Sequence, residues 1–316
     1  MTKHVVSCIV LSIPIWAVPL GRADEPLTIA TFNCYWLIES KIQQRHDVSA
    51  QSADERAAAF AEKAGLVARA IADLDADVIG LVEVGPERDV QVLRDAVEAE
   101  GVDYPHVAVC DSKDSFTRQH VAVFSKRPLR DVVREITGRE SYDEELDDAD
   151  TEKDTGVSKG MRVTFTAAGR DVHLYVVHFV SERGGHEADA KRVAQASIVR
   201  RHYLDLLRRG QHVVVVGDLN DYRGQPAVRR VRGRDDIFGD LIQTGQTRYF
   251  NSSVLGTRWT HEFRGQRRQI DHVLVSRSIK EAATRSNGIR ARVVPHAGEA
   301  VSDHRPFVVT IRFRDP

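Results

Sequence analysis

Polar side chains that could do acid–base chemistry or bind a metal stand where an apolar run of the sequence ends. Gly217-Asp218-Leu219-Asn220-Asp221 follows the apolar run 213–216. A carboxylate and an amide two residues apart, where a strand opens into a loop, can point together into a cleft at the sheet edge. The same Gly-Asp-X-Asn pattern also suits an ordinary turn. The motif alone therefore leaves a site and a turn about equally open.

A second motif, Ser302-Asp303-His304, precedes the C-terminal apolar run. An adjacent aspartate and histidine can serve a metal and a proton transfer, because carboxylate oxygens suit magnesium and histidine titrates near neutral pH. Asp271 opens another apolar run in Ile270-Asp271-His272. If buried, it could fix the tautomer of His304 as an aspartate does in a hydrolytic triad. The alternative for Asp271 is a capping role.

Strands and helices must bring these motifs together. Hydrophobic periodicity predicts helices over residues 53–74, 87–100 and 187–209. Apolar or alternating runs predict strands at 27–34, 77–84, 104–110, 121–125, 161–166, 172–179, 213–216, 270–276, 291–294 and 306–313. Asn33 and Glu83 then lie at the ends of the first two strands. Two halves with the same strand-and-helix rhythm favour an α/β fold: a four-layer α/β/β/α sandwich of two packed mixed sheets with helices outside.

The order of these motifs along the chain resembles the endonuclease/exonuclease/phosphatase superfamily, over about residues 27–313. The resemblance is carried by Thr31-Phe32-Asn33, Gly80-Leu81-Val82-Glu83, Val176-Val177-His178-Phe179, Gly217-Asp218-Leu219-Asn220, Ile270-Asp271-His272 and Ser302-Asp303-His304. Chance assembly of the full ordered set is improbable. That superfamily includes deoxyribonucleases, apurinic endonucleases, sphingomyelinases and inositol phosphatases.

The resemblance implies a divalent metal site. Glu83 is the principal ligand of Mg²⁺ or Mn²⁺ by this resemblance, with Asp303 and Asn33 in or next to the metal shell. Such a cation neutralises charge that develops when a phosphodiester is attacked. The acidic stretch 140–154 could in addition hold a structural Ca²⁺, but a solvated surface loop is the simpler interpretation.

The resemblance also implies roles for the catalytic side chains. Asp218 orients or deprotonates the attacking water, and Asn220 holds a phosphate oxygen. His304, supported by Asp271, handles proton transfer or charge. His178 matches the second histidine of the deoxyribonuclease branch.

The sequence departs from the pattern of two branches of the superfamily. Tyr35 stands where apurinic endonucleases carry a further acidic residue, which disfavours that branch. Gln119 replaces the glutamate that supports the second histidine in deoxyribonucleases, which weakens an acid–base role for His178. Arg162 resembles a phosphate-contacting arginine of the same branch, although an exposed strand arginine is nearly as good an account. The segment 178–195 looks like the corresponding stretch of bacterial extracellular nucleases.

The substrate has to be inferred from local charge, because the formal net charge of −1 gives no global attraction to polyanions. Arginines cluster beside two of the motifs at Arg223, Arg229, Arg230, Arg232, Arg234, Arg258, Arg264, Arg267 and Arg268. They could contact phosphates or be solvated loop residues. Trp259 could stack on a base or lie in the core.

We therefore expect a nuclease acting on DNA or RNA. A phosphatase or a phospholipid or sphingomyelin phosphodiesterase is the alternative, because a fold does not fix a substrate. A non-catalytic secreted binding protein is a third possibility, disfavoured by the intact site. No exposed aromatic hairpin, as expected of a membrane-engaging enzyme, is evident from the sequence. We expect a monomer without a stable protein partner.

The N-terminus has the pattern of an export signal over residues 1–23. Lys3 and His4 precede an apolar run, and Gly21-Arg22-Ala23 provides a small-residue cleavage site. An uncleaved anchor is the alternative, but the run 5–20 is short of the about 20 residues that span a bilayer. We expect a secreted or periplasmic domain, 24–316, without a membrane anchor. Cys34 and Cys110 then remain, and the sequence leaves open whether they join.

Overall fold

The protein is described by a computed structural model over residues 26–46, 48–50, 52–143, 153–222, 224–233, 241–243, 259–284, 288–295, 298 and 300–314. The predicted signal segment and cleavage site, most of the acidic stretch, and Arg223, Arg234 and Arg258 lie outside these residues. None of the helices within these ranges is long and apolar enough to cross a membrane.

Two sheets form the centre of the molecule. The first has the strand order β15 (Ile289–Val293), β16 (Phe307–Ile311), β1 (Leu27–Leu37), β2 (Val78–Val84), β4 (His120–Ser125) and β3 (His106–Val109). The second has the order β11 (Leu241–Gln243), β14 (Asp271–Ser276), β10 (His212–Asp218), β9 (Arg170–His178), β8 (Gly160–Ala167) and β5 (Arg130–Val133). The β1–β2 and β9–β10 pairs are parallel and the other pairs antiparallel, so both sheets are mixed.

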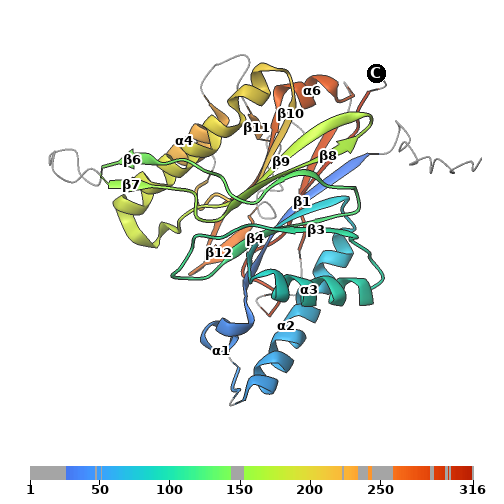
Figure 1. The fold of residues 1–316 in the computed structure, drawn as a ribbon, viewed down its shortest axis with the longest axis vertical. Coiled ribbons are helices and arrows are strands. Elements are labelled where there is room, and N and C mark those ends of the chain that lie inside the picture. The colour runs from blue at the N-terminus through green and yellow to red at the C-terminus, as the bar shows by residue number, and fades with distance from the viewer. Residues whose placement is uncertain are drawn as a thin grey trace, which may run out of the picture.

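Helices cover the outer faces of both sheets, which confirms the predicted four-layer arrangement. Figure 1 shows α4 on one side of the sheets and α2 and α3 on the other. The helices are η1 (Glu39–Lys41), α1 (Ile42–Arg45), α2 (Ala53–Leu74), α3 (Glu87–Ala99), η2 (Glu182–Gly184), α4 (Gly185–Arg208), α5 (Pro226–Arg232) and α6 (Arg277–Ala282). One apolar cluster fills the space between the sheets, and two others lie under the helices.

Local sequence explains the boundaries of α2. Ser52 accepts a hydrogen bond from the Glu55 N–H, and the Glu55 side chain accepts one from the Ser52 N–H, which is a capping box. The buried face of α2, including Phe60, Val67 and Ile71, packs in the cluster under the first sheet. The structure thus confirms the helix predicted over residues 53–74.

Two glycines allow close approach of strands, Gly80 between the two sheets and Gly217 between β10 and β9 of the second sheet. A Cβ added at Gly80 of β2 would come within 2.6 Å of Val216 on β10. A Cβ at Gly217 would come within 1.9 Å of the Val177 carbonyl oxygen, and Gly217 has φ of 130°. Side chains at these positions would separate the strand ends that carry the polar motifs.

Two short hairpins depart from the sequence predictions. The acidic stretch is not wholly a loop, because β6 (Glu140–Tyr142) pairs with β7 (Lys153–Thr155), and Tyr142 and Lys153 bind Glu187 on α4. A second hairpin joins β12 (His261–Phe263) to β13 (Gln266–Arg268). Runs of three residues are too short for periodicity to detect.

The two cysteines that the structure describes, Cys34 and Cys110, are free and buried in different layers. Cys34 lies in the cluster under the helices and Cys110 in the cluster between the sheets. They therefore lie on opposite faces of the first sheet.

Candidate active site

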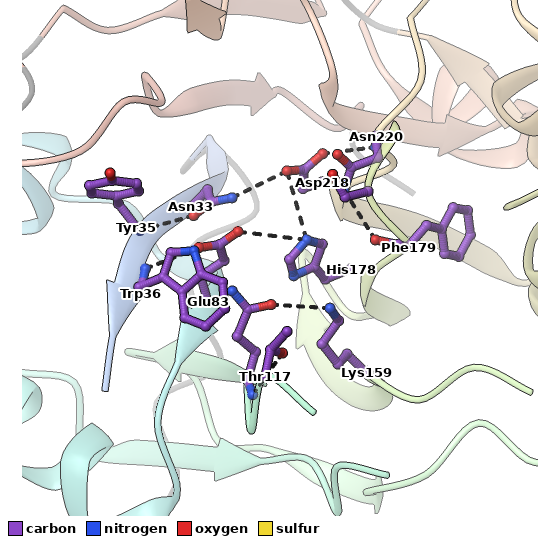
Figure 2. Close-up of polar contacts among 12 residues, drawn as sticks. Asn33, Tyr35, Trp36, Glu83, Thr117, Lys159, His178, Phe179, Asp218 and Asn220 are labelled. Atoms are coloured by element: carbon purple, nitrogen blue, oxygen red, sulfur yellow. Dashed lines mark hydrogen bonds and ion pairs between the residues drawn. The ribbon is translucent and has the colours of Figure 1, made fainter. Parts of the chain in front are cut away.

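Strand register brings three of the predicted residues into one row of the second sheet. Asp218 at the end of β10 lies opposite His178 of β9 on one side and opposite Asp271 of β14 on the other. Directly opposed residues share a face of the sheet. In the first sheet, Asn33 of β1 lies opposite Val82 of β2, next to Glu83. The ends of both sheets thus carry polar side chains toward one place, as Figure 2 shows.

Irregular backbone sets the direction of several of these side chains. Glu83 has φ of 59° at a register shift in β2, and Tyr35 and Trp36 have φ of 51° at a similar shift in β1. Asn220 has φ of 47°. Non-glycine residues with positive φ are uncommon and cost energy, and bulges of this kind often re-aim a side chain beside an active site.

These side chains border a cleft of about 860 Å³. We call it the catalytic cleft, and define it by Glu83, His178, Asp218, Asn220, Asp303 and His304, all of which line it. Asn33 and Asp271 are fully buried behind it. The volume far exceeds that of a single phosphodiester group, so the cleft has room for the parts of a substrate that adjoin the phosphate.

His304 is held from behind by Asp271. Its Nδ1–H donates to Asp271 Oδ2 at 2.7 Å, which leaves Nε2 toward the cleft, 3.9 Å from Asp218 Oδ2 and 3.8 Å from Asp303 Oδ1. Burial lowers the pKa of His304. The charge and hydrogen bond of Asp271, followed by the charges of Asp218 and Asp303, outweigh burial and raise the pKa overall. The imidazole is therefore held as a cation. This is the arrangement predicted for the pair.

Asp218 is fixed by two donors. Its Oδ2 accepts from the Asn33 amide at 3.2 Å, and its Oδ1 accepts from the Asn220 N–H at 2.8 Å. Burial, followed by the charge of Asp271, raises the pKa of Asp218, while His304 acts in the opposite direction. The Asn220 amide in turn donates to the Phe179 carbonyl at 3.0 Å. Asp218 is thus an oriented carboxylate whose proton affinity is higher than usual, as suits a base.

His178 lies between the two sheets. Its Nε2 is 3.8 Å from Glu83 Oε1 and 4.0 Å from Asp218 Oδ2. Burial, followed by the charges of Lys159 and His304, lowers its pKa well below the ordinary value. His178 is therefore neutral, unlike His304, and the two histidines cannot play the same role.

The environment of His178 also explains the substitution at Gln119. Lys159 donates to Gln119 Oε1 at 3.1 Å and pairs with Asp114 at 3.4 Å. The side-chain oxygen of Gln119 thus accepts a hydrogen bond from a buried lysine. Within the described residues His178 Nδ1 has no hydrogen-bond partner. Lys159 lines the cleft, and sequence reasoning missed it because one lysine before a strand has no distinguishing pattern.

The carboxylates fit a divalent cation. Glu83 and Asp303 both line the cleft, and burial and the charge of Glu83 raise the pKa of Asp303 to about 6 against the effect of His304. Asp303 Oδ1 is buried without a hydrogen-bond partner among the described residues. A cation would relieve this repulsion and occupy that oxygen. Asn33 Oδ1 already accepts a hydrogen bond from the Tyr35 N–H at 2.9 Å. The amide oxygen is therefore partly engaged, and Asn33 lies beside such an ion.

A third histidine, His261 of β12, was not anticipated. Its ring lies 4.4 Å from that of His304, and its Nε2 is 3.8 Å from Asp303 Oδ2. Ligand atoms of His261, Asp303 and His304 lie within 4.8 Å of one another, as do those of Asp218, Asp271 and His304. Glu83 belongs to neither group. Only the hairpin brings His261 here, so no local pattern could have identified it.

The structure does not bring every predicted residue to the cleft. Arg162 of β8 follows Met161, which packs between the sheets, so Arg162 faces the outer side and does not line the cleft. The arginines of α5, Arg229, Arg230 and Arg232, do not line it either. Trp259 is covered by the Arg305 guanidinium at 3.4 Å from its ring centroid, and is likewise outside the lining.

Comparisons with known proteins agree with this geometry. The model of the Endonuclease/Exonuclease/phosphatase family matches residues 30–304. A comparison with curated proteins found no match.

Among solved structures, the chain is similar to truncated TDP2 from Caenorhabditis elegans, with 14% identity and a TM-score of 0.57 over 92% of this chain and 98% of that one. It is similar to sphingomyelinase C from Streptomyces griseocarneus, with 18% identity and a TM-score of 0.55 over 91% and 99%. It is also similar to a mutant beta toxin from Staphylococcus aureus with bound magnesium ions, with 14% identity and a TM-score of 0.55 over 90% and 99%. At these identities the likeness shows a shared fold.

Proposed function

The chain belongs to the endonuclease/exonuclease/phosphatase family and is a metal-dependent phosphoesterase, and from that premise we propose that it is a nuclease that hydrolyses phosphodiester bonds of DNA or RNA. The observation that carries the proposal is the charge of the cleft wall. Although the net charge of the chain is −1, six cationic side chains line the catalytic cleft beside its carboxylates: Arg45, Lys159, Arg183, Lys191, Arg264 and Arg268. Such a wall fits a substrate with several phosphates.

The metal is proposed to be Mg²⁺ or Mn²⁺, held by Glu83 and Asp303 with Asn33 beside them. When bound, it supplies positive charge to the phosphate oxygens. Oxygen donors from carboxylate and amide groups are the ligands these ions prefer.

The side chains of this chain divide the remaining work. Asp218 is held by Asn33 and Asn220, and would orient the attacking water and take its proton. His304, kept cationic by Asp271, would stabilise the charge that develops on the phosphate or protonate the leaving oxygen. His178, kept neutral by burial, would hydrogen-bond a phosphate oxygen without adding charge.

A phospholipid or sphingomyelin phosphodiesterase is the second candidate, and one observation favours it. The β12–β13 hairpin carries Phe263 with 47% of its surface exposed. An exposed aromatic hairpin was not expected from the sequence, and it is a feature that can engage a membrane.

A substrate panel with a metal-ligand variant tests the proposal. Purified protein is incubated with a single-stranded oligonucleotide, plasmid DNA, RNA, sphingomyelin vesicles and methyl p-nitrophenyl phosphate, with Mg²⁺ or with excess EDTA. We expect cleavage of nucleic acid that is lost in EDTA, and Glu83→Gln should abolish it while leaving the circular dichroism spectrum unchanged. Arg162→Gln, outside the cleft, is the matched control and should retain activity. Hydrolysis of sphingomyelin with nucleic acid untouched would replace the nuclease by the second candidate.

A further inference from the structure

Exposed aromatic side chains gather at the catalytic cleft. Among the described residues, the large hydrophobic side chains that remain exposed are Phe116 (84%), Phe263 (47%), Tyr222 (42%) and Val132 (39%). Phe116 and Phe263 both line the cleft. A phenylalanine that is 84% exposed gains little from burial on folding, so the core gives no reason for its position. A reason has to be sought in what enters the cleft.

Phe116 is presented by an ordered turn in the connection between β3 and β4. Asp114 Oδ1 accepts from the backbone N–H groups of Phe116 at 3.1 Å and Thr117 at 2.9 Å. The same carboxylate pairs with Lys159, and the Lys113 N–H donates to the Ser158 carbonyl at 2.8 Å. The aromatic ring is therefore held out from a turn that is tied to the cleft wall.

Phe263 is surrounded by cations. It lies at the end of β12, just before the Arg264-Gly265 turn, where both residues have positive φ. The Arg264 and Arg183 guanidinium groups lie 5.1 and 5.7 Å from its ring centroid, and the His261 ring is nearly parallel to it, at 9°. Within the described part of the chain, both arginines contact the Phe263 ring and neither forms a salt bridge. An exposed aromatic ring with guanidinium groups against it suits a base next to its phosphates.

The two aromatic residues reach the cleft from different segments of the chain. In Figure 2, Thr117 and Lys159 are on one side of His178, while Asn33 and Asp218 are on the other. Phe116 is next to Thr117 in the chain. Phe263 belongs to the hairpin whose His261 contacts His304, and His304 is 3.4 Å from the Asn33 amide. A strand with its phosphate at His178 and Asp218 therefore meets a cleft wall that carries both aromatic residues.

We propose that Phe116 and Phe263 are stacking platforms for the unpaired bases that flank the scissile phosphate, so that the cleft selects single-stranded nucleic acid. The proposal rests on the nuclease function proposed above. Every base has a π-face on which an aromatic side chain can stack, and in a duplex these faces are covered by neighbouring base pairs. The cationic side chains of the cleft wall would contact the phosphates of the same strand, whose flexible backbone can follow them.

A membrane surface fits these residues less well. An interfacial membrane anchor needs a continuous apolar face. Here the exposed aromatic residues are separated by charged ones, since Arg183 and Arg264 lie against Phe263, and Arg268 lies 5.8 Å from the Tyr222 ring. Exposed rings with charged groups next to them suit stacking on single bases rather than insertion into a bilayer.

The test compares truncation with aromatic replacement. Phe116→Ala and Phe263→Ala should each raise KM for a single-stranded oligonucleotide by about tenfold, because the loss of one base–aromatic stack has an effect of this order. KM for the same sequence as a duplex and the rate with methyl p-nitrophenyl phosphate should not change. Phe116→Trp and Phe263→Trp should retain tight binding, and Val132→Ala, exposed but away from the cleft, serves as the control.

The possible outcomes separate the two proposals. Cleavage of nucleic acid by the wild type with an unchanged single-strand KM in both alanine variants overturns the stacking platforms and leaves the nuclease standing. An equal loss with the small diester also overturns them, because it shows damage to the catalytic centre. If the wild type leaves nucleic acid intact, the nuclease itself fails, and weaker pelleting of the alanine variants with sphingomyelin vesicles would assign the same residues to a membrane.

Discussion

At the scale of single residues, the site depends on two histidines in opposite charge states. His304 is bonded to Asp271, and lies near two further carboxylates. His178 is equally buried but lies next to Lys159, whose charge adds to the effect of burial. In a medium of low dielectric constant the neighbouring charge decides which form is stable. One histidine is thus available as a cation and the other as a neutral hydrogen-bonding group.

A double-mutant cycle tests whether Asp271 acts through His304. His304→Ala should lower kcat by at least about 10²-fold, because the positive charge and the proton donor are both lost. Asp271→Asn should lower the same step, and the double variant should be little worse than His304→Ala alone. The measurement is kcat and KM for each variant with an oligonucleotide and with methyl p-nitrophenyl phosphate. Additive losses would show that Asp271 serves the fold independently of His304.

At the scale of elements, the loop that leads to Asp303 and His304 is hydrogen-bonded to a helix that is distant in sequence. Lys63 of α2 donates to the carbonyls of Ala300 at 2.7 Å and Val301 at 3.0 Å. Ser302 Oγ donates to the carbonyl of Asn33 in β1 at 2.7 Å. The segment before Asp303 and His304 is therefore held from two sides. A buried carbonyl that loses its donor costs about 1–3 kcal/mol, and of the two residues only Val301 is buried.

Replacing Lys63 by methionine should show what these hydrogen bonds contribute to stability and activity. Lys63→Met should lower the free energy of unfolding by about 1–3 kcal/mol and lower kcat more than it changes KM, because the loop rather than the substrate wall is loosened. Urea unfolding and steady-state kinetics provide the measurements. Lys280→Met, at an exposed position of α6, is the matched control. A deficit no larger than that of the control would contradict the role of Lys63.

The same variant has an expected pH dependence. Burial, against the opposing charges of Cys34 and Asp303, lowers the pKa of Lys63 from 10.5 to about 8. Between these values the unfolded chain binds a proton that the folded chain does not, so the wild type gains stability as pH rises. The deficit of Lys63→Met should therefore be larger at pH 10 than at pH 7. A deficit that is unchanged or smaller at pH 10 would show that Lys63 keeps its proton in the folded protein as readily as in the unfolded chain.

At the scale of the whole molecule, the cleft exists only because two sheets end at the same place. Glu83 and Asn33 come from the first sheet, and His178, Asp218 and Asp271 come from the second. Gly80 and Gly217 permit the close approach between strands that this requires. The cationic wall is likewise assembled from separate segments, including α1, η2, α4 and the β12–β13 hairpin.

Export of the whole chain remains a prediction from the N-terminal segment. Since the apolar run ends at a small-residue site, the protein recovered from the culture medium or periplasm should begin at Asp24. Intact-mass measurement of that protein shows which residue comes first. A mass that includes Met1 would sink the predicted cleavage. Replacement of Ala23 by a bulky residue should block processing and provides the control.

The sequence by itself determined the three long helices, most strands of the two large sheets and the chain order of the site. The spacing of Phe60, Val67 and Ile71 is a local property, and the helix it predicted is α2. Asp218, Asp271 and His304 each stand at the edge of an apolar run, so their motifs were visible without coordinates. Strand ends gather at a sheet edge, which is why the predicted catalytic residues converge in the structure.

Tertiary structure alone decided which other residues join them. His261 and Phe263 reach the cleft through a short hairpin, and Lys159 reaches it through a buried ion pair; neither feature leaves a periodic pattern in the sequence. Arg162 carries the right chemistry but faces the outer side of β8, because the alternation of a strand depends on which neighbour is buried between the sheets. Charge states followed the same rule, since His304 has a hydrogen bond and a charge from Asp271, whereas burial and the charge of Lys159 act on His178.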